Sequence, residues 1–198
     1  MKSSDELRLV IFDFDGTLID SKCDIAASVN LTLMDMDLPT RTPEEIFTFV
    51  GDGVKRLLRL SVGEGNESHY EKALAIFRKH YLAHCLDSTR FYEGLDSVFH
   101  SLQGKTKALA TNKSFEYTLR IVEGLGARNT FAAIECPNDI YDLKPNPGML
   151  FRILDQLGIP PEHAVLVGDS TNDVRAAKAA GIRACAVGYG YGLSLIHI

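Results

Sequence analysis

Two acidic residues two positions apart, Asp13 and Asp15, follow a short apolar run and precede Gly16 and Thr17. Phosphoryl transfer needs a nucleophile in line with phosphorus and a separate group that carries a proton. Two carboxylates at this spacing can divide those tasks, and the glycine permits a tight turn whose backbone amides can face phosphate oxygens. The pair alone is also compatible with a helix cap or a simple turn.

A second acidic pair, Asp169 and Asp173, follows another apolar run later in the chain. With Asp13, these carboxylates offer hard oxygen ligands, which Mg²⁺ prefers. The alternative is that Asp169 or Asp173 caps the helix predicted next. Since a cap can also bind a metal, this alternative does not exclude a magnesium site.

Two further segments carry groups that suit phosphate. Thr111 and Asn112, in the run Thr-Asn-Lys, offer a hydroxyl and an amide that can donate hydrogen bonds. Lys144 begins the run Lys-Pro-Asn-Pro, and the two prolines disfavour a helix at this position. Its ammonium could neutralise a phosphate and crowded carboxylates, although a solvated loop lysine is the competing interpretation.

The elements that must position these residues alternate between strand and helix over most of the chain. Apolar runs predict strands at 7–12, 107–110, 131–135, 164–167 and 183–187, and apolar spacing predicts helices at 115–123, 148–157 and 173–180. Residues 22–90 have helical spacing almost throughout, and Thr42, Pro43 and Glu45 form a helix-start signature. The glycine-rich run 188–192 follows a strand and opens no helix, so it predicts a loop.

This order predicts an α/β fold with a doubly wound parallel sheet, a Rossmann-like core, and an inserted helical cap domain. The expected boundaries are 1–20 and 91–198 for the core and 21–90 for the cap. Ligands of such sheets bind beyond the carboxyl ends of the strands. Three polar pairs follow predicted strands: Asp13 and Asp15 the first, Thr111 and Asn112 the second, and Asp169 and Asp173 the fourth. We therefore expect them to converge in one cleft beneath the cap.

In combination, these segments resemble the haloacid dehalogenase superfamily, and specifically its phosphatases. The resemblance covers residues 8–192 and is nearest to the phosphoglycolate phosphatases. It rests on the runs FDFDGTLIDS, DIAASVN, FVGDGVKRLL, FYEGL, ATNK, KPNPGML and VGDSTNDVRAAKAAGI. The final residues, 193–198, do not resemble the family's continuation, which predicts a truncated chain with a foreign tail, loosely packed and without a helix.

The resemblance implies a role for each matching residue. Asp13 is the implied nucleophile that becomes an aspartyl phosphate, and Asp15 the implied general acid and base. Thr111 and Lys144 are the implied phosphate-binding pair, with Thr17 and Asn112 as supporting groups. The implied Mg²⁺ ligands are Asp13, Asp169, Asp173 and the backbone carbonyl of Asp15.

The cap segment 49–56 lies where the family has a loop that faces the substrate. There Arg56 or Lys55 would suit a substrate carboxylate, and a solvated helix face is the competing interpretation. The expected substrate is a small phosphate ester, foremost 2-phosphoglycolate, ahead of pyrophosphate, nucleotides and sugar phosphates. The alternative enzyme is a sugar-phosphate mutase on the same core. The alternative from another functional class is a non-catalytic binding protein on a retained fold.

Bulk composition sets the remaining expectations. The chain has 198 residues, a net charge of -5 and no basic cluster, so no affinity for nucleic acid is expected. Four scattered cysteines and the lack of a long apolar run favour a cytoplasmic protein without a membrane partner. Whether it is a monomer or a homodimer is left open.

Overall fold

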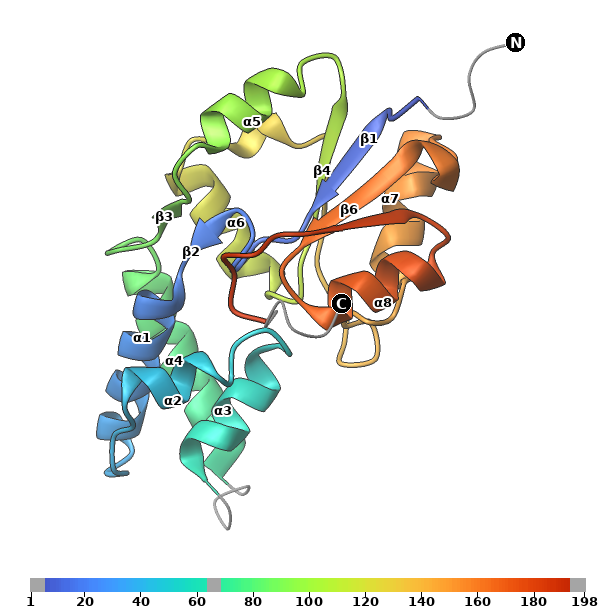
Figure 1. Ribbon diagram of the computed structural model, residues 1–198. Coiled ribbons are helices and arrows are strands. Elements are labelled where there is room, and N and C mark those ends of the chain that lie inside the picture. The colour runs from blue at the N-terminus through green and yellow to red at the C-terminus, as the bar shows by residue number, and fades with distance from the viewer. Residues whose placement is uncertain (1–5, 64–68, 193–198) are drawn as a thin grey trace.

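A five-stranded parallel sheet forms the centre of the computed structural model, which describes residues 6–63 and 69–192 (Figure 1). The strand order is β5-β4-β1-β6-β7, with β1 in the middle. The strands are β1 (Leu9–Phe12), β4 (Thr106–Ala110), β5 (Ala133–Glu135), β6 (Ala164–Gly168) and β7 (Arg183–Ala186). Because the strands are parallel, their carboxyl ends all lie at one edge of the sheet.

Helices pack on both faces of this sheet. One face is covered by α5 (Leu95–Ser101) and α6 (Phe115–Gly124), and the other by α7 (Gly148–Leu157) and α8 (Thr171–Ala179). The central strand β1 has apolar side chains on both faces, which is why helices cover both. Val10 and Phe12 belong to one apolar cluster, while Leu9 and Ile11 belong to the other. A strand buried on both faces reads as a continuous apolar run, as this one does.

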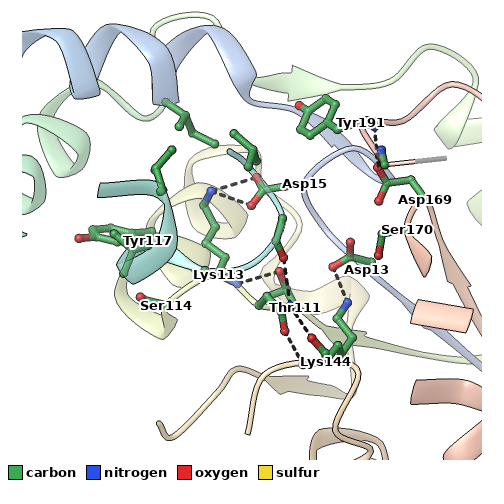
Figure 2. Close-up of a pocket in the computed structure, with 18 of the residues that line it drawn as sticks. Asp13, Asp15, Thr111, Lys113, Ser114, Tyr117, Lys144, Asp169, Ser170 and Tyr191 are labelled. Carbon is green, nitrogen blue, oxygen red and sulfur yellow. Dashed lines mark hydrogen bonds and ion pairs between the residues drawn. The ribbon is translucent and has the colours of Figure 1, made fainter. Parts of the chain in front are cut away.

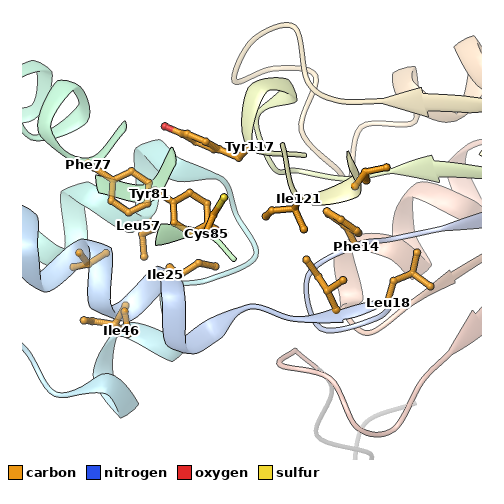
Figure 3. Packing of buried hydrophobic residues seen from close by; sticks show 14 of the residues in the cluster. Phe14, Leu18, Ile25, Ile46, Leu57, Phe77, Tyr81, Cys85, Tyr117 and Ile121 are labelled. Atoms are coloured by element: carbon orange, nitrogen blue, oxygen red, sulfur yellow. The ribbon is translucent and has the colours of Figure 1, made fainter. Parts of the chain in front are cut away.

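A group of four helices is inserted between β1 and β4 and lies beside the sheet (Figure 1). They are α1 (Lys22–Asp35), α2 (Pro43–Phe47), α3 (Val54–Val62) and α4 (Tyr70–His84). Apolar residues of α1, α3 and α4 continue without a break into those of α6, as Figure 3 shows for Ile25, Leu57, Tyr81 and Ile121. The inserted helices therefore share a core with one face of the sheet.

Both connections to the inserted helices pass through a small antiparallel ladder. It pairs β2 (Ile19–Asp20) with β3 (Arg90–Phe91). Asp24, near the start of α1, fastens the return connection, since its carboxylate accepts the backbone N–H groups of Ser88 at 3.0 Å and Thr89 at 2.8 Å. The ladder thus fixes where the chain leaves and re-enters the core.

The predicted α/β fold with a helical insert is confirmed. Two details differ: α5 and the β2–β3 ladder were not predicted, and α8 begins at Thr171 rather than at 173 because Ser170 is its N-cap. Two short helices, η2 (Arg128–Thr130) and η3 (Pro161–His163), complete the order. The capping box of Thr42 and Glu45 is present at α2.

Some expectations are not decided by this architecture. The division into a core of 1–20 and 91–198 and a cap of 21–90 stays a prediction. The expected state of residues 193–198 falls outside the described residues. Among the helices of 6–63 and 69–192, none has the length and apolar character needed to cross a membrane.

Candidate active site

The predicted site residues converge at the carboxyl edge of the sheet. Asp13, Thr111 and Asp169 each follow directly on a strand, β1, β4 and β6 respectively, and these three strands are neighbours. All three residues line one pocket of about 740 Å³, a volume that includes its open mouth (Figure 2). Residues of the inserted helices, such as Val54 and Leu57, line the opposite wall.

Three buried carboxylates lie together beside this pocket. Asp13, Asp169 and Asp173 each offer an oxygen within 4.8 Å of the others. Burial raises the pKa of Asp13 to about 8; Lys144 opposes this rise, and the charges of Asp173 and Asp169 add to it. Burial likewise raises the pKa of Asp169. Asp13 and Asp169 thus resist ionisation, and with Asp173 they offer the hard oxygen ligands that suit a divalent cation, so these residues could hold a metal ion.

Lys144 connects this acidic cluster to the sheet. Its Nζ lies 2.7 Å from Asp13 Oδ1 and 2.6 Å from Asp173 Oδ1, and it donates to the carbonyl of Ala110 at 2.7 Å. Burial disfavours the ammonium, but the two carboxylates outweigh burial and hold the pKa of Lys144 above its ordinary value. The solvated loop lysine is therefore the wrong interpretation, since this residue is 3 % exposed.

Asp15 is separated from the cluster by its side-chain partners. Both of its carboxylate oxygens lie 2.9 Å from Lys113 Nζ, and Ser21 Oγ donates to Oδ1 at 2.5 Å. Gly16 follows with a φ of +82°, and a Cβ there would lie 2.5 Å from Asp169 Oδ2. The glycine therefore permits both the turn and the close approach of the two acidic loops.

Thr111 and Asn112 have different roles in the structure. Thr111 lines the pocket, and its Oγ1 accepts the backbone N–H of Lys113 at 3.2 Å. Asn112 holds two loops together: its Oδ1 accepts the N–H of Lys144 at 2.7 Å, and its Nδ2 donates to the carbonyl of Gly51 at 3.0 Å. Asn112 thus fixes the loop of Lys144 against the segment that precedes α3.

Arg56 lies apart from these groups. Its guanidinium is bonded to Asp52, whose other oxygen accepts from Asn172 Nδ2 of α8 at 2.7 Å. The side chain of Arg56 is 55 % exposed and is not among the residues that line the pocket. Lys55 lies over the ring of Tyr70. That Arg56 or Lys55 binds the substrate stays a prediction.

Sequence reasoning missed three contributors to the site. The sequence assigns no role to Lys113, although its place directly after Thr111 and Asn112 is a usable signal. Tyr81 reads as an ordinary core residue of α4, yet it lines the pocket. The backbone N–H groups of Tyr191 and Gly192 donate to Asp169 Oδ2 at 2.6 and 3.1 Å, and the glycine-rich composition of their loop gave no sign of this contact.

Known proteins match this chain along nearly its whole length. The sequence model of the family described as haloacid dehalogenase-like hydrolase matches residues 10–187. A phosphoglycolate phosphatase of Chromobacterium violaceum is 36% identical over 192 residues, which are 93% of this chain and 86% of that protein. One from Aquifex aeolicus is 33% identical over 187 residues, again 93% of this chain and 86% of the relative.

Solved structures agree with the sequence comparison. The crystal structure of a predicted phosphoglycolate phosphatase from Haemophilus somnus superposes with a TM-score of 0.87 at 26% identity, covering 98% of this chain and 90% of that one. These matches indicate the same family as the fold and the acidic cluster at the strand ends. The chain belongs to the haloacid dehalogenase-like hydrolases.

Proposed function

We propose that this protein is a Mg²⁺-dependent phosphatase that hydrolyses a small phosphomonoester, 2-phosphoglycolate, through an aspartyl phosphate on Asp13. The observation that carries the proposal is the division between two carboxylates two residues apart. Asp13 belongs to the buried acidic cluster, whereas Asp15 is held outside it by Lys113 and Ser21. The relatives named phosphoglycolate phosphatase support the choice of substrate.

The first half of the reaction forms a bond between a carboxylate oxygen of Asp13 and phosphorus. The bond from phosphorus to the ester oxygen breaks, and Asp15, which must enter this step in its protonated form, gives a proton to that leaving oxygen. Thr111 Oγ1 and Lys144 Nζ, which reach the same pocket, bind the oxygens of the phosphoryl group. In the second half, Asp15 takes a proton from water, which attacks the phosphorus and releases Asp13 and inorganic phosphate.

The acidic cluster fits the expected metal. Asp13, Asp169 and Asp173, together with the backbone carbonyl of Asp15, would hold Mg²⁺, and Thr17 Oγ1 lies 3.5 Å from Asp169 Oδ1 in support. When bound, the ion would supply positive charge that lets an anionic carboxylate meet an anionic phosphate. The hydrogen bonds from the Tyr191 and Gly192 amides keep Asp169 oriented toward this cluster.

Release of phosphate from 2-phosphoglycolate tests the proposal directly. We expect turnover with Mg²⁺ and none after chelation. Asp13→Asn should retain less than about one per cent of the activity, since the amide is no nucleophile. Asp35→Asn is the matched control, because Asp35 is an exposed carboxylate that pairs with His80 and does not line the pocket.

Two outcomes would contradict the proposal. Activity that survives exhaustive chelation would exclude the metal requirement, and substantial activity of Asp13→Asn would exclude the covalent step. A mutase would show itself differently, since its turnover of a sugar monophosphate would require a bisphosphate activator.

A further inference from the structure

Lys113 provides a second buried cation in the pocket, distinct from Lys144. The residue is 9 % exposed, and its Nζ contacts both carboxylate oxygens of Asp15 (Figure 2). The acidic cluster has its own ammonium in Lys144, so the charge of Lys113 is not needed there. The two lysines extend to different carboxylates, which gives the pocket two separate positions for an anion.

The ammonium of Lys113 lies over the aromatic ring of Tyr81. The ammonium is 4.8 Å from the centre of this ring, which is a cation–π distance. Tyr81 is 1 % exposed, and its hydroxyl has no hydrogen-bond partner among the described residues. A buried hydroxyl without a partner destabilises the protein unless something supplies an acceptor. Since Tyr81 lines the pocket, a ligand is a candidate for that acceptor.

Apolar side chains make up much of the lining on the side of the inserted helices. Ile25, Val54, Leu57 and Phe77 line the pocket together with Tyr81, and Ser114 and Tyr117 add polar groups. In such surroundings a carboxylate is bound only where a cation and hydrogen-bond donors meet it. Lys113 offers the cation, and the Tyr81 hydroxyl, which has no hydrogen-bond partner within residues 6–63 and 69–192, offers a donor. The exposed, paired Arg56 is not part of the lining.

We propose that Lys113 and Tyr81 bind the carboxylate of the substrate while Thr111 and Lys144 bind its phosphate. This inference rests on the proposed function and names the groups that select a carboxylate-bearing ester. Binding exchanges one ion pair for another: the substrate carboxylate takes the ammonium of Lys113, which frees the side chain of Asp15 to move toward the leaving oxygen.

Two esters that differ only at the second anion test the assignment. We compare kcat/KM for 2-phosphoglycolate and for 2-hydroxyethyl phosphate, in which a hydroxymethyl group replaces the carboxylate. The wild-type protein should prefer 2-phosphoglycolate. Lys113→Met should reduce that preference at least about tenfold, the range of a lost charge-assisted hydrogen bond. Lys113→Arg, which keeps the charge, should restore part of the preference.

Tyr81→Phe separates recognition from folding. Because the hydroxyl has no hydrogen-bond partner in the part of the chain that the structure describes, its removal should leave the melting temperature unchanged or higher. The preference for 2-phosphoglycolate should nevertheless fall about fivefold, as expected for one neutral donor. Lys105→Met is the control for loss of a lysine, since Lys105 pairs with Glu6 at 3.8 Å, away from the pocket.

The outcomes are distinct. If Lys113→Met lowers kcat/KM for both esters by the same factor, Lys113 only positions Asp15, and the inference is wrong. If the wild-type protein hydrolyses both esters equally well, the carboxylate has no binding site, although the phosphatase activity stands. If it hydrolyses neither, the proposed function fails, and this inference fails with it.

Discussion

Asp13 lies with Asp169 and Asp173 around one ammonium, that of Lys144, which contacts two of the three carboxylates. In the metal-free protein, burial and the neighbouring charges raise the pKa of Asp13 from 3.8 to about 8. A raised pKa means that the folded state holds a proton that the unfolded state releases. The resulting stabilisation is complete below pH 3.8 and is lost as the pH rises through about 8.

The same proton competes with a metal ion at Asp13. Below about pH 8, Mg²⁺ must displace it, so the apparent affinity for Mg²⁺ should rise with pH and become constant above about pH 8. One proton gives at most about a tenfold rise for each pH unit. Calorimetric titration of the protein with Mg²⁺ at several pH values measures this dependence, and an affinity independent of pH would contradict it.

At the scale of elements, two helices begin with the same device. Ser170 caps α8 and Thr42 caps α2, each with a capping box that includes the residue three positions on. In α8 that residue is Asp173, whose Oδ2 also accepts from Ser170 Oγ at 2.5 Å. One cap therefore starts a helix and holds a member of the acidic cluster, whereas the other only starts a helix.

Substitution of each cap by alanine should separate these roles. Ser170→Ala and Thr42→Ala should both reduce the free energy of unfolding by about 1 kcal/mol, because each loses a capping hydrogen bond. Only Ser170→Ala should also weaken Mg²⁺ binding, by about tenfold, since it releases Asp173. Thermal melts with and without Mg²⁺ measure both effects. Equal Mg²⁺ affinity in the two variants would show that the cap does not support the cluster.

At the scale of the whole molecule, the loop after β7 joins the core to the start of the inserted helices. The backbone N–H of Tyr191 bonds to Asp169, while its hydroxyl accepts the N–H groups of Ser21 at 2.8 Å and Lys22 at 3.2 Å. The same hydroxyl lies 3.1 Å from Asp20 Oδ1. One residue therefore connects the acidic cluster with the junction of β2 and α1.

Tyr191→Phe should loosen this junction without disturbing the sheet. We expect hydrogen exchange at the amides of Ser21 and Lys22 to become about three- to tenfold faster, the range for one lost hydrogen bond. Tyr189→Phe is the matched control, because the Tyr189 hydroxyl donates to the Thr17 carbonyl at 2.9 Å and does not contact those amides. Exchange that is unchanged in Tyr191→Phe would show that other contacts fix the junction.

Local patterns were sufficient to predict the fold class and to place Asp13, Thr111 and Asp169 at one pocket. The apolar runs before Asp13, Thr111 and Asp169 form neighbouring parallel strands, so their carboxyl ends bring these residues together. Periodicity succeeds for such strands and for α6 and α7 because each buries a regular set of side chains. The β2–β3 ladder escaped prediction because each strand has two residues, too few to show any period.

The sequence alone placed Asp13, Thr111 and Asp169 at one edge of the sheet, since each follows directly on a predicted strand of a parallel sheet. Only the tertiary structure decided which group contacts which. Lys113 pairs with Asp15 across 98 residues, and the Tyr191 amide reaches Asp169 across 22. The tertiary structure also buries the Tyr81 hydroxyl without a hydrogen-bond partner among the residues described, in a helix whose sequence is typical of an ordinary core helix. Such pairings depend on how separate loops pack together in space. The spacing of residues along the chain does not specify the distance between two side chains on different loops.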